Sequence, residues 1–281
     1  MRRGWSGWQK DLPSLLDWSG KNRLGVIDLG GDADTAAPLV LDAGMKIGSA
    51  DLGLFADWQG LLSPTGETRK RTVEKISKYV ETCCRLGVKN FFICLIPENP
   101  ALERAANLGF AIESFNALEP VLRAGGGRIV VEGWPGPGAL ACTPEGYRLL
   151  FSGCPSPVFG VNYDPSHLLR MCIDPMRFLN EFQERVYHVH GKDADISHNS
   201  LYEFGVEQTP TEGKAPAFGG SYWRYTIPGH GQSPWLRILQ KLGGAKYAGT
   251  ISIELEDANF NGSTEGEQRG ILAAASFLEG C

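Results

Sequence analysis

The sequence lacks the charge and hydropathy features of nucleic-acid-binding and membrane proteins. Its 281 residues include 27 Lys and Arg against 32 Asp and Glu, a formal net charge of −5, and no basic stripe that would neutralise phosphates. No apolar run approaches the length that spans a bilayer, and the positively charged start MRRGWSGWQKDLP is not followed by the apolar stretch of a signal peptide. We therefore expect a cytoplasmic protein whose partners are small molecules, with no role for nucleic acid or membrane.

The cysteines also lack the pattern of a disulfide framework. There are seven, an odd number, and no two form a CxxC pair, so reduced thiols are expected. Cys94, inside the run NFFICLI, is interpreted as a small core residue. Cys154 and Cys172 flank a histidine-rich segment but have no base at motif spacing, which disfavours a thiol nucleophile.

What the sequence does contain is a repeated alternation of short apolar runs and longer amphipathic stretches. Runs rich in Val, Ile and Phe predict seven strands, and a weaker segment at 3–5 predicts an eighth. The seven runs are 24–29, 46–52, 90–96, 128–133, 158–164, 186–190 and 250–256. The predicted helices are 12–21, 34–43, 68–86, 101–123, 143–151, 175–183, 234–242 and 265–278. Thr143, Asp174 and Ser233 each precede a proline and are predicted to cap the helix that follows.

Strand followed by helix, eight times in about 250 residues, is the pattern of a (β/α)8 TIM barrel. A doubly wound α/β sheet is the alternative, but Gly30 and Gly31 after the first run do not complete a G-x-G-x-x-G fingerprint. We predict an α/β protein with a single TIM-barrel domain over 1–281. The segment 194–231 follows the seventh strand when 3–5 is counted first. Its length and aromatic content predict an active-site lid or substrate wall.

Ligand-type side chains gather at the ends of four predicted strands. Glu132, Asp164, His190 and Glu254 each end an apolar run, where a barrel places its active site. Three carboxylates and one imidazole form an oxygen-rich set that suits Mn²⁺, Mg²⁺ or Co²⁺, and Zn²⁺ less well. His188 points to the same side of its strand as His190 but lies deeper, and a satisfied core residue is the alternative reading of it. Each residue alone is more often a salt-bridged or core group, but four together favour a metal site.

Such a site predicts proton-transfer chemistry on a hydroxy-ketone. A divalent ion on two adjacent substrate oxygens acidifies the C–H between them and stabilises the enediolate that follows. Glu132 and Glu254, from different sides of the barrel, could remove a proton from one face and return one to the other. The outcome would be epimerisation of a carbon or a shift of a carbonyl. Trp134, Trp223 and Tyr225 are candidates for an apolar wall against the sugar, with loop packing as the alternative.

Several segments resemble one known family. VNYDPSHL, YHVHGKD, YWRYTIPGHG with the nearby Trp235, and GTISIELED are similar to segments of the xylose-isomerase-like TIM-barrel family of sugar phosphate isomerases and epimerases. That family includes ketose 3-epimerases and inosose dehydratases, and the resemblance covers nearly the whole chain. It implies metal ligation by Glu132, Asp164, His190 and Glu254, with Glu132 and Glu254 also serving as the acid and base.

The choice between two glutamates and the role of a second histidine rest on this resemblance. His167, three residues after Asp164, is similar to the family histidine that contacts substrate oxygens. Glu254 is preferred to Glu256 because it stands five residues after Gly249, as the ligand glutamate does in the epimerases.

The basic residue that follows the ligand histidine differs between branches of the family. Lys192 follows it here, as in dehydratase-like members, whereas the epimerases carry an arginine a few residues further on. Arg224 in the long segment is the stand-in for that arginine. The predicted substrate-binding set is His167, Lys192, Arg224, Trp134 and His188.

The leading hypothesis is a divalent-metal-dependent isomerase or epimerase that acts on a ketose or keto-sugar through a metal-stabilised enediolate. One alternative is a metal-dependent lyase or dehydratase acting on an inosose or a 3-keto-glycoside, and another is a barrel that binds sugar without turning it over. Endonuclease-IV-like cleavage is disfavoured, because its multi-metal cluster needs more histidines than the strand ends carry. The sequence leaves the phosphorylation of the substrate open, and a homo-oligomer is also an open alternative.

Overall fold

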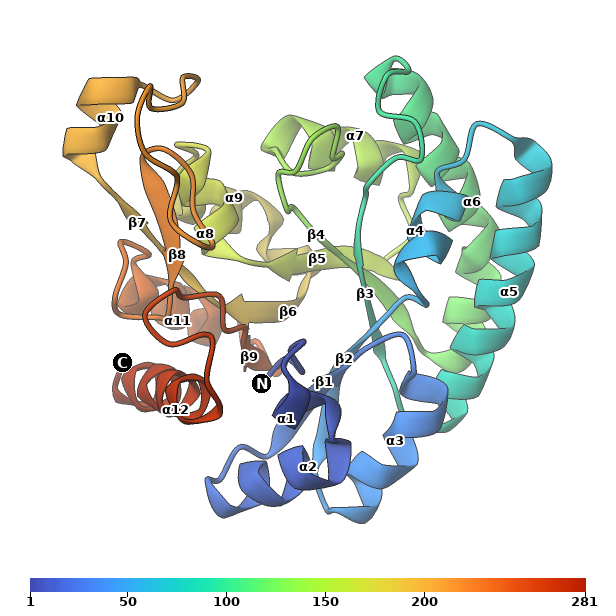
Figure 1. The fold of residues 1–281 in the computed structure, drawn as a ribbon. Coiled ribbons are helices and arrows are strands. Elements are labelled where there is room, and N and C mark those ends of the chain that lie inside the picture. The colour runs from blue at the N-terminus through green and yellow to red at the C-terminus, as the bar shows by residue number, and fades with distance from the viewer.

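The computed structural model describes residues 1–281 and contains a sheet of seven parallel strands that curves into a barrel (Figure 1). Neighbouring strands follow the order β1-β2-β3-β4-β5-β6-β9. The strands are β1 (Val26–Leu29), β2 (Lys46–Asp51), β3 (Asn90–Cys94), β4 (Arg128–Glu132), β5 (Phe159–Tyr163), β6 (Val186–Gly191) and β9 (Ile251–Ile253). Each lies within or within one residue of an apolar run, so the seven predicted strands are confirmed.

The first residues of the chain lie between β9 and β1 and close the barrel. The backbone N–H of Arg2 donates to the carbonyl of Ile253 with an N···O distance of 3.0 Å. The N–H of Asp28 donates to the carbonyl of Met1 at 2.9 Å, and Arg2 forms a single parallel bridge with Asp28. The (β/α)8 fold is therefore confirmed, but the eighth strand predicted at 3–5 lies earlier, and Trp5 is 82% exposed outside the sheet.

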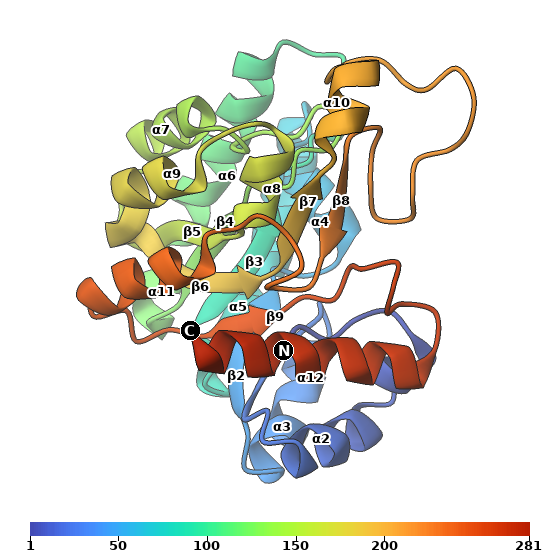
Figure 2. The same ribbon diagram turned by 90° about the vertical axis from the view of Figure 1, so that its left-hand side faces the viewer.

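Helices cover the outside of this barrel (Figures 1 and 2). The helices of the chain are α1 (Gly7–Lys10), α2 (Leu12–Lys21), α3 (Ala33–Asp42), α4 (Phe55–Leu61), α5 (Gly66–Arg85), α6 (Arg104–Gly125), α7 (Pro144–Gly153), α8 (Pro165–Arg170), α9 (Pro175–Phe182), α10 (His198–Phe204), α11 (Trp235–Gly244) and α12 (Thr264–Gly280), with a 3-10 turn at Gln183–Arg185. Of these, α10 lies away from the barrel (Figures 1 and 2). The apolar core fills the space between sheet and helices. For example, Phe115 of α6 stacks on Phe159 of β5 with ring centroids 5.4 Å apart. None of the helices combines the length and apolar character that a bilayer crossing requires.

Two of the three predicted helix caps are present. The Thr143 hydroxyl accepts a hydrogen bond from the N–H of Gly146 at 3.2 Å, and Asp174 accepts from the first turn of α9. The prediction for Ser233 is wrong, because α11 begins at Trp235 without a side-chain cap. The N–H of Ser233 instead donates to the buried carboxylate of Asp193 at 2.7 Å.

The long segment 194–231 is more ordered than its sequence predicted. It contains most of β7 (Asp193–Ile196), all of α10 and β8 (Trp223–Thr226), and β7 and β8 pair as an antiparallel ribbon. Figure 2 shows this ribbon beside α8, with α10 and the connecting loop beyond it. The Asp193 carboxylate stabilises the base of this ribbon. It accepts hydrogen bonds from the backbone N–H groups of Ala194 at 2.8 Å and Gly229 at 3.2 Å, as well as from that of Ser233.

Polar side chains, rather than apolar ones alone, fill the inside of the barrel. Five of these polar residues come from five different strands, and each is at most 1% exposed: Asp28, Ser49, Asn162, His188 and Ser252. Because buried polar groups need partners, their hydrogen bonds to one another determine how the side chains above them are oriented. Cys94 is buried in the core as predicted, and all seven thiols are free.

Candidate metal centre and active site

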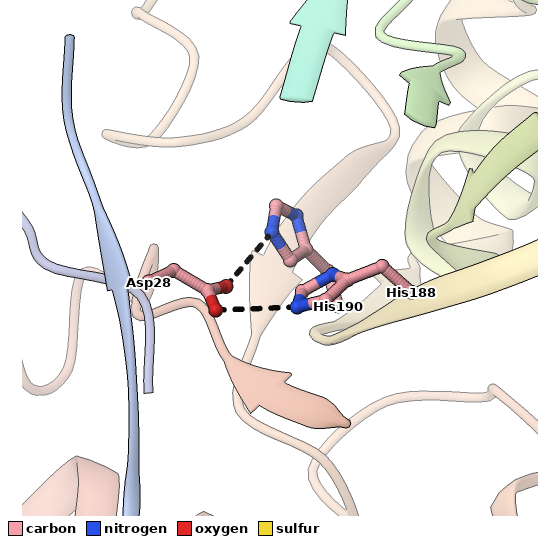
Figure 3. Close-up of side chains that lie close together, drawn as sticks. All are labelled: Asp28, His188 and His190. Atoms are coloured by element: carbon pink, nitrogen blue, oxygen red, sulfur yellow. Dashed lines mark hydrogen bonds and ion pairs between the residues drawn. The ribbon is translucent and has the colours of Figure 1, made fainter. Parts of the chain in front are cut away.

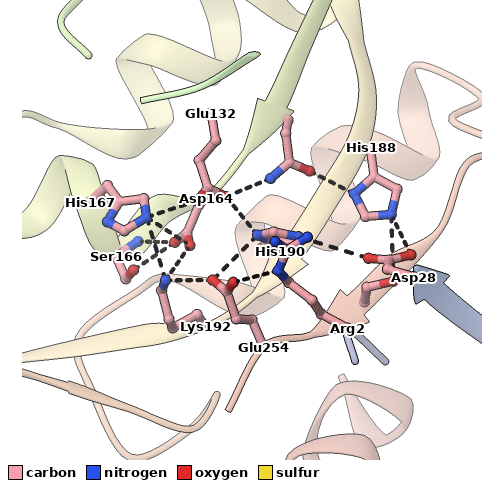
Figure 4. Close-up of polar contacts among 12 residues, drawn as sticks. Arg2, Asp28, Glu132, Asp164, Ser166, His167, His188, His190, Lys192 and Glu254 are labelled. Atoms are coloured by element: carbon pink, nitrogen blue, oxygen red, sulfur yellow. Dashed lines mark hydrogen bonds and ion pairs between the residues drawn. The ribbon is translucent and has the colours of Figure 1, made fainter. Parts of the chain in front are cut away.

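The carboxylates of Glu132, Asp164 and Glu254 meet at the carboxyl ends of the barrel strands (Figure 4). Glu132 is the last residue of β4, Asp164 directly follows β5 and Glu254 directly follows β9. A ligand atom from each of these three and from His167 all lie within 4.8 Å of one another. Parallel strands converge at their carboxyl ends in a barrel, which is why residues up to 122 positions apart in sequence form one cluster.

Lys192 lies among these carboxylates and is 1% exposed. Its Nζ is 2.6 Å from Glu254 Oε2, 3.0 Å from Glu256 Oε2 and 3.2 Å from Asp164 Oδ2. Burial alone would lower the pKa of Lys192, but the surrounding carboxylates raise it well above its usual range. The ammonium is therefore charged at neutral pH and occupies a position that attracts cations.

Asp164 is held by the start of α8. Its Oδ1 accepts from the N–H of Ser166 at 2.9 Å and from the Ser166 hydroxyl at 2.6 Å. Its Oδ2 is buried and accepts no hydrogen bond of good geometry, and meets only the nitrogens of Lys192 and His167 at 3.2 and 3.4 Å. One oxygen thus positions the side chain while the other stays available at the cluster.

His190 projects from β6 into the same cluster. Its Nδ1 lies 2.5 Å from Glu132 Oε2 and 3.3 Å from Glu254 Oε2. Burial would lower the pKa of His190, but the charges of Glu132 and Glu254 raise it to about 10. Its Nε2 lies 3.8 Å from Asp28 Oδ2 (Figure 3). The ring thus stands between a deep carboxylate and the cluster at the mouth (Figure 4).

A buried chain of side chains connects the barrel interior to Glu132. Asp28 Oδ1 lies 3.2 Å from His188 Nε2, His188 Nδ1 lies 2.6 Å from Asn162 Oδ1, and the Asn162 amide donates to Glu132 Oε2 at 2.5 Å. Burial would raise the pKa of Asp28, but the His188 charge and hydrogen bond lower it below its usual range. Asp28, His188 and His190 also form a compact group of three metal-type ligands, but this group is buried beneath the mouth. His188 therefore lies outside the cavity lining and orients Glu132 through Asn162.

The second histidine at the mouth, His167, is held by the β7–β8 ribbon. Tyr225 of β8 places its hydroxyl 2.6 Å from His167 Nδ1 and accepts a hydrogen bond from Arg170 Nη1 at 2.6 Å. Because Arg170 can only donate, the single phenolic hydrogen is left for His167 Nδ1. The neutral ring then carries its hydrogen on Nε2, which faces Glu132 Oε1 at 3.2 Å. A protonated Nε2 offers no lone pair to a cation, so His167 in this form is arranged as a hydrogen-bond donor.

We expect Tyr225→Phe to release this arrangement. In ¹⁵N-histidine NMR spectra, the wild-type His167 should show Nε2–H and an unprotonated Nδ1, whereas the variant should show a mixture of tautomers, because Nδ1 loses its donor. Tyr222→Phe is the matched control, since the Tyr222 hydroxyl donates to the backbone carbonyl of Arg170 and not to His167. A wild-type His167 protonated on Nδ1 would contradict the assignment.

The family to which this site belongs follows from comparison with known proteins. The sequence profile described as xylose isomerase-like TIM barrel matches residues 17–281. The chain belongs to the xylose isomerase-like TIM-barrel family. This membership confirms the resemblance identified in the sequence.

Solved structures with this fold include sugar epimerases. 3-Keto-D-glucoside 4-epimerase YcjR from E. coli superposes with a TM-score of 0.71 at 13% identity, covering 100% of this chain and 98% of that one. D-Psicose 3-epimerase from Clostridium cellulolyticum H10, solved with D-tagatose, superposes with a TM-score of 0.69 at 14% identity, covering 97% and 94%. At these identities the likeness establishes the fold.

A curated relative is the uncharacterized protein YfiH of Bacillus subtilis (strain 168). It is 36% identical over 103 residues, which are 36% of this chain and 32% of that protein. The aligned part thus spans about a third of the relative.

Within this xylose isomerase-like barrel, the remaining predicted substrate contacts separate into two groups. Trp134 and Lys192 line a cavity of about 570 Å³ at the mouth, together with Glu132 and Glu254. Arg224 is not part of that lining. Its Nη2 pairs with Asp195 at 3.1 Å on the ribbon, and its side chain is 33% exposed.

A basic residue that sequence reasoning missed lies inside the cavity. Arg2 donates through Nε to Glu254 Oε1 at 3.0 Å and through Nη2 to Asp51 Oδ1 at 3.0 Å, and its guanidinium lies 4.2 Å from the centre of the Phe92 ring. Arg2 thus fixes the oxygen of Glu254 that Lys192 does not hold. No sequence motif marks Arg2 or Arg170. Arg2 reaches the cavity because its segment closes the barrel, and Arg170 contributes by donating to Tyr225 of the ribbon.

Proposed function

We propose that this chain is a divalent-metal-dependent sugar isomerase or epimerase that moves a proton at a carbon next to the carbonyl of a ketose or keto-sugar. The observation that carries the proposal is the meeting of Glu132, Asp164 and Glu254 within 4.8 Å at the mouth of the barrel. His190 lies against two of these carboxylates, with its Nδ1 2.5 Å from Glu132 Oε2 and 3.3 Å from Glu254 Oε2. Membership of the xylose isomerase-like family and the fold shared with two sugar epimerases support the proposal.

The donor set fits a hard divalent cation. The three carboxylates converge, and His190 Nδ1 lies against those of Glu132 and Glu254. Asp164 Oδ2 has no hydrogen bond, and oxygens of Asp164 and Glu254 already contact the ammonium of Lys192. Glu132, Asp164, His190 and Glu254 would hold the ion, with Mn²⁺, Mg²⁺ and Co²⁺ better suited than Zn²⁺. When bound, such an ion supplies Lewis-acid polarisation of substrate oxygens.

Glu132 and Glu254 are the proposed proton carriers. Burial would raise the pKa of Glu132, but the charge of His190 lowers it below the usual range, and Lys192 does the same for Glu254. Both carboxylates are therefore ionised at neutral pH and able to accept a proton. Because they come from β4 and from the end of β9, they can serve opposite faces of a sugar carbon.

The other residues at the mouth bind and orient. Lys192 and the Nε2–H of His167 are donors for substrate oxygens, and Trp134 provides an apolar surface within the cavity. Arg2 keeps the Glu254 carboxylate in place. Asn162 does the same for Glu132.

The test is proton exchange with solvent. We expect incubation of the protein and Mn²⁺ with a panel of ketoses and keto-sugars in deuterated water to place deuterium on carbon in at least one of them, as detected by NMR. Addition of a chelator should abolish the exchange. Exchange in no member of a broad panel would contradict the proposal.

The buried Lys192 supports one alternative outcome at the same site. An ammonium beside the two bases could protonate a leaving hydroxyl or glycosyl group, which would make the chain a lyase or dehydratase on an inosose or 3-keto-glycoside. An unsaturated product in the same NMR experiment, instead of an epimer, would identify this reaction.

A further inference from the structure

The cavity at the mouth extends well beyond the proposed reaction centre. Glu132, Lys192 and Glu254 line its inner part, and the lining continues over the ends of β1 and β2 to Trp5 and Phe55. Its volume of about 570 Å³ lies in the range of sites that hold ligands larger than a single sugar ring.

A row of aromatic rings leads from the inner part of this cavity to its rim. Phe92, in the middle of β3, packs against Trp58 with ring centroids 5.8 Å apart, and Trp58 packs against Phe55 at 6.0 Å. Phe92 and Trp58 are 3% and 8% exposed, whereas Phe55 is 53% exposed. The buried rings thus support an outer ring whose surface is free to contact a ligand.

A second exposed aromatic residue stands at the same rim. The side chain of Trp5 is 82% exposed and lines the cavity with Leu54, which is 59% exposed. Large apolar side chains gathered on a cavity rim, rather than scattered over the surface, mark a binding site.

Polar groups accompany this apolar rim, as a carbohydrate ligand requires. Arg3 lines the cavity and is fixed there, since its guanidinium donates to Asp32 at 2.9 Å and to the carbonyls of Gln9 and Lys10 at 3.1 and 2.9 Å. Asp32 and Lys10 line the same region. Rigid donors and acceptors beside aromatic faces suit a ring that has hydroxyls at its edge and C–H groups on its face.

We propose that this outer part of the cavity is a subsite for a second sugar ring, so that the substrate is a keto-glycoside rather than a free monosaccharide. The inference rests on the proposed function, because it takes the cluster of Glu132 and Glu254 as the place of the reacting ring. Trp5 and Phe55 provide the surfaces on which the second ring lies. Arg3 and Asp32 meet its hydroxyls.

The test compares one-ring and two-ring probes by isothermal titration calorimetry with the Mn²⁺-loaded protein. Methyl β-D-glucopyranoside, cellobiose and maltose are the probes, the two disaccharides covering both linkage geometries. We expect at least one disaccharide to bind more tightly than the methyl glucoside. Trp5→Ala and Phe55→Ala should each weaken its binding about threefold to tenfold and leave the methyl glucoside unchanged.

Tyr202→Ala is the matched control, because Tyr202 is an 88% exposed aromatic residue on α10 outside the cavity lining. Equal binding of one-ring and two-ring probes would overturn the subsite, and so would disaccharide binding that is insensitive to both substitutions. A second copy of the chain covering the rim, seen by sedimentation as a dimer that Trp5→Ala dissociates, would overturn it too.

The outcome is separable from that of the proposed function. Deuterium exchange on monosaccharide ketoses without any preference for disaccharides would remove the subsite and leave the proton-transfer chemistry. Disaccharide binding that depends on Trp5 and Phe55, without exchange on any keto-sugar, would remove the chemistry and leave the subsite.

Discussion

Replacing Glu132 with glutamine is expected to lower the rate of carbon-bound deuterium exchange about a hundredfold to ten-thousandfold, the usual contribution of a general base. The glutamine keeps the shape of the side chain and can still accept the hydrogen bond of Asn162, but it cannot carry a proton. Initial rates measured by NMR on the best substrate of the panel provide the comparison. Circular dichroism and thermal unfolding verify that the variant is folded.

Glu254→Gln should have an effect of the same order, because both carboxylates are needed to move a proton between faces. Glu256→Gln is the matched control. Glu256 lies two residues further along the same strand end, contacts Lys192 at 3.0 Å and has a side chain that is 33% exposed. The exchange rate should therefore fall much less in Glu256→Gln than in Glu132→Gln. A Glu132→Gln variant with the wild-type exchange rate would contradict the assigned role.

The main elements of the fold could be predicted because each strand is buried on both faces. Phe91, Phe92 and Ile93 in β3, for example, form a continuous apolar run, which is typical of a parallel sheet. The eighth strand position has no such run. Met1 to Arg3 need only a few backbone hydrogen bonds to close the barrel, and Arg2 places a charged side chain in the cavity, so hydrophobic patterning gives no signal there.

The candidate site was predictable to the extent that it depends on strand ends. Glu132, Asp164 and Glu254 each follow an apolar run, and the barrel geometry alone brings such positions together. Asp28 and Asn162 were missed, although they orient the same site from below. A single polar residue inside a strand has no periodicity of its own, and its role depends on partners from distant strands, such as His188 for both residues.

The ribbon shows a third limit of sequence reasoning. Tyr225 and Trp223 were interpreted only as a possible apolar wall, whereas Tyr225 holds His167 and Trp223 lies over the guanidinium of Arg170 at 4.1 Å. These contacts join residues more than fifty positions apart. They arise from how β7 and β8 lie against α8, which no local pattern determines.

Replacing Lys192 with methionine should destabilise the metal-free protein by about 3–5 kcal/mol, the usual cost of removing one partner from a buried ion pair. The methionine fills nearly the same space, but Asp164 and Glu254 then lose the ammonium that lies 3.2 and 2.6 Å from their oxygens. Urea denaturation in the presence of a chelator measures the difference in the free energy of unfolding.

The same variant should gain more stability from Mn²⁺ than the wild type does. In the wild type, an incoming divalent cation competes with the Lys192 ammonium for the same carboxylates, whereas in Lys192→Met it meets them unneutralised. Since binding to the native state stabilises it according to affinity, the increase in Tm on addition of Mn²⁺ should be larger in the variant.

Lys75→Met is the control for loss of a lysine in an ion pair. Lys75 pairs with Asp57 at 2.6 Å, but its side chain is 60% exposed, so its replacement should cost at most about 1 kcal/mol and leave the response to Mn²⁺ unchanged. If Lys192→Met and the wild type responded equally to Mn²⁺, the ammonium and the cation would not share the carboxylates of Asp164 and Glu254. The ion would then have to bind elsewhere, and the metal-dependent reaction proposed for this cluster would lose its site.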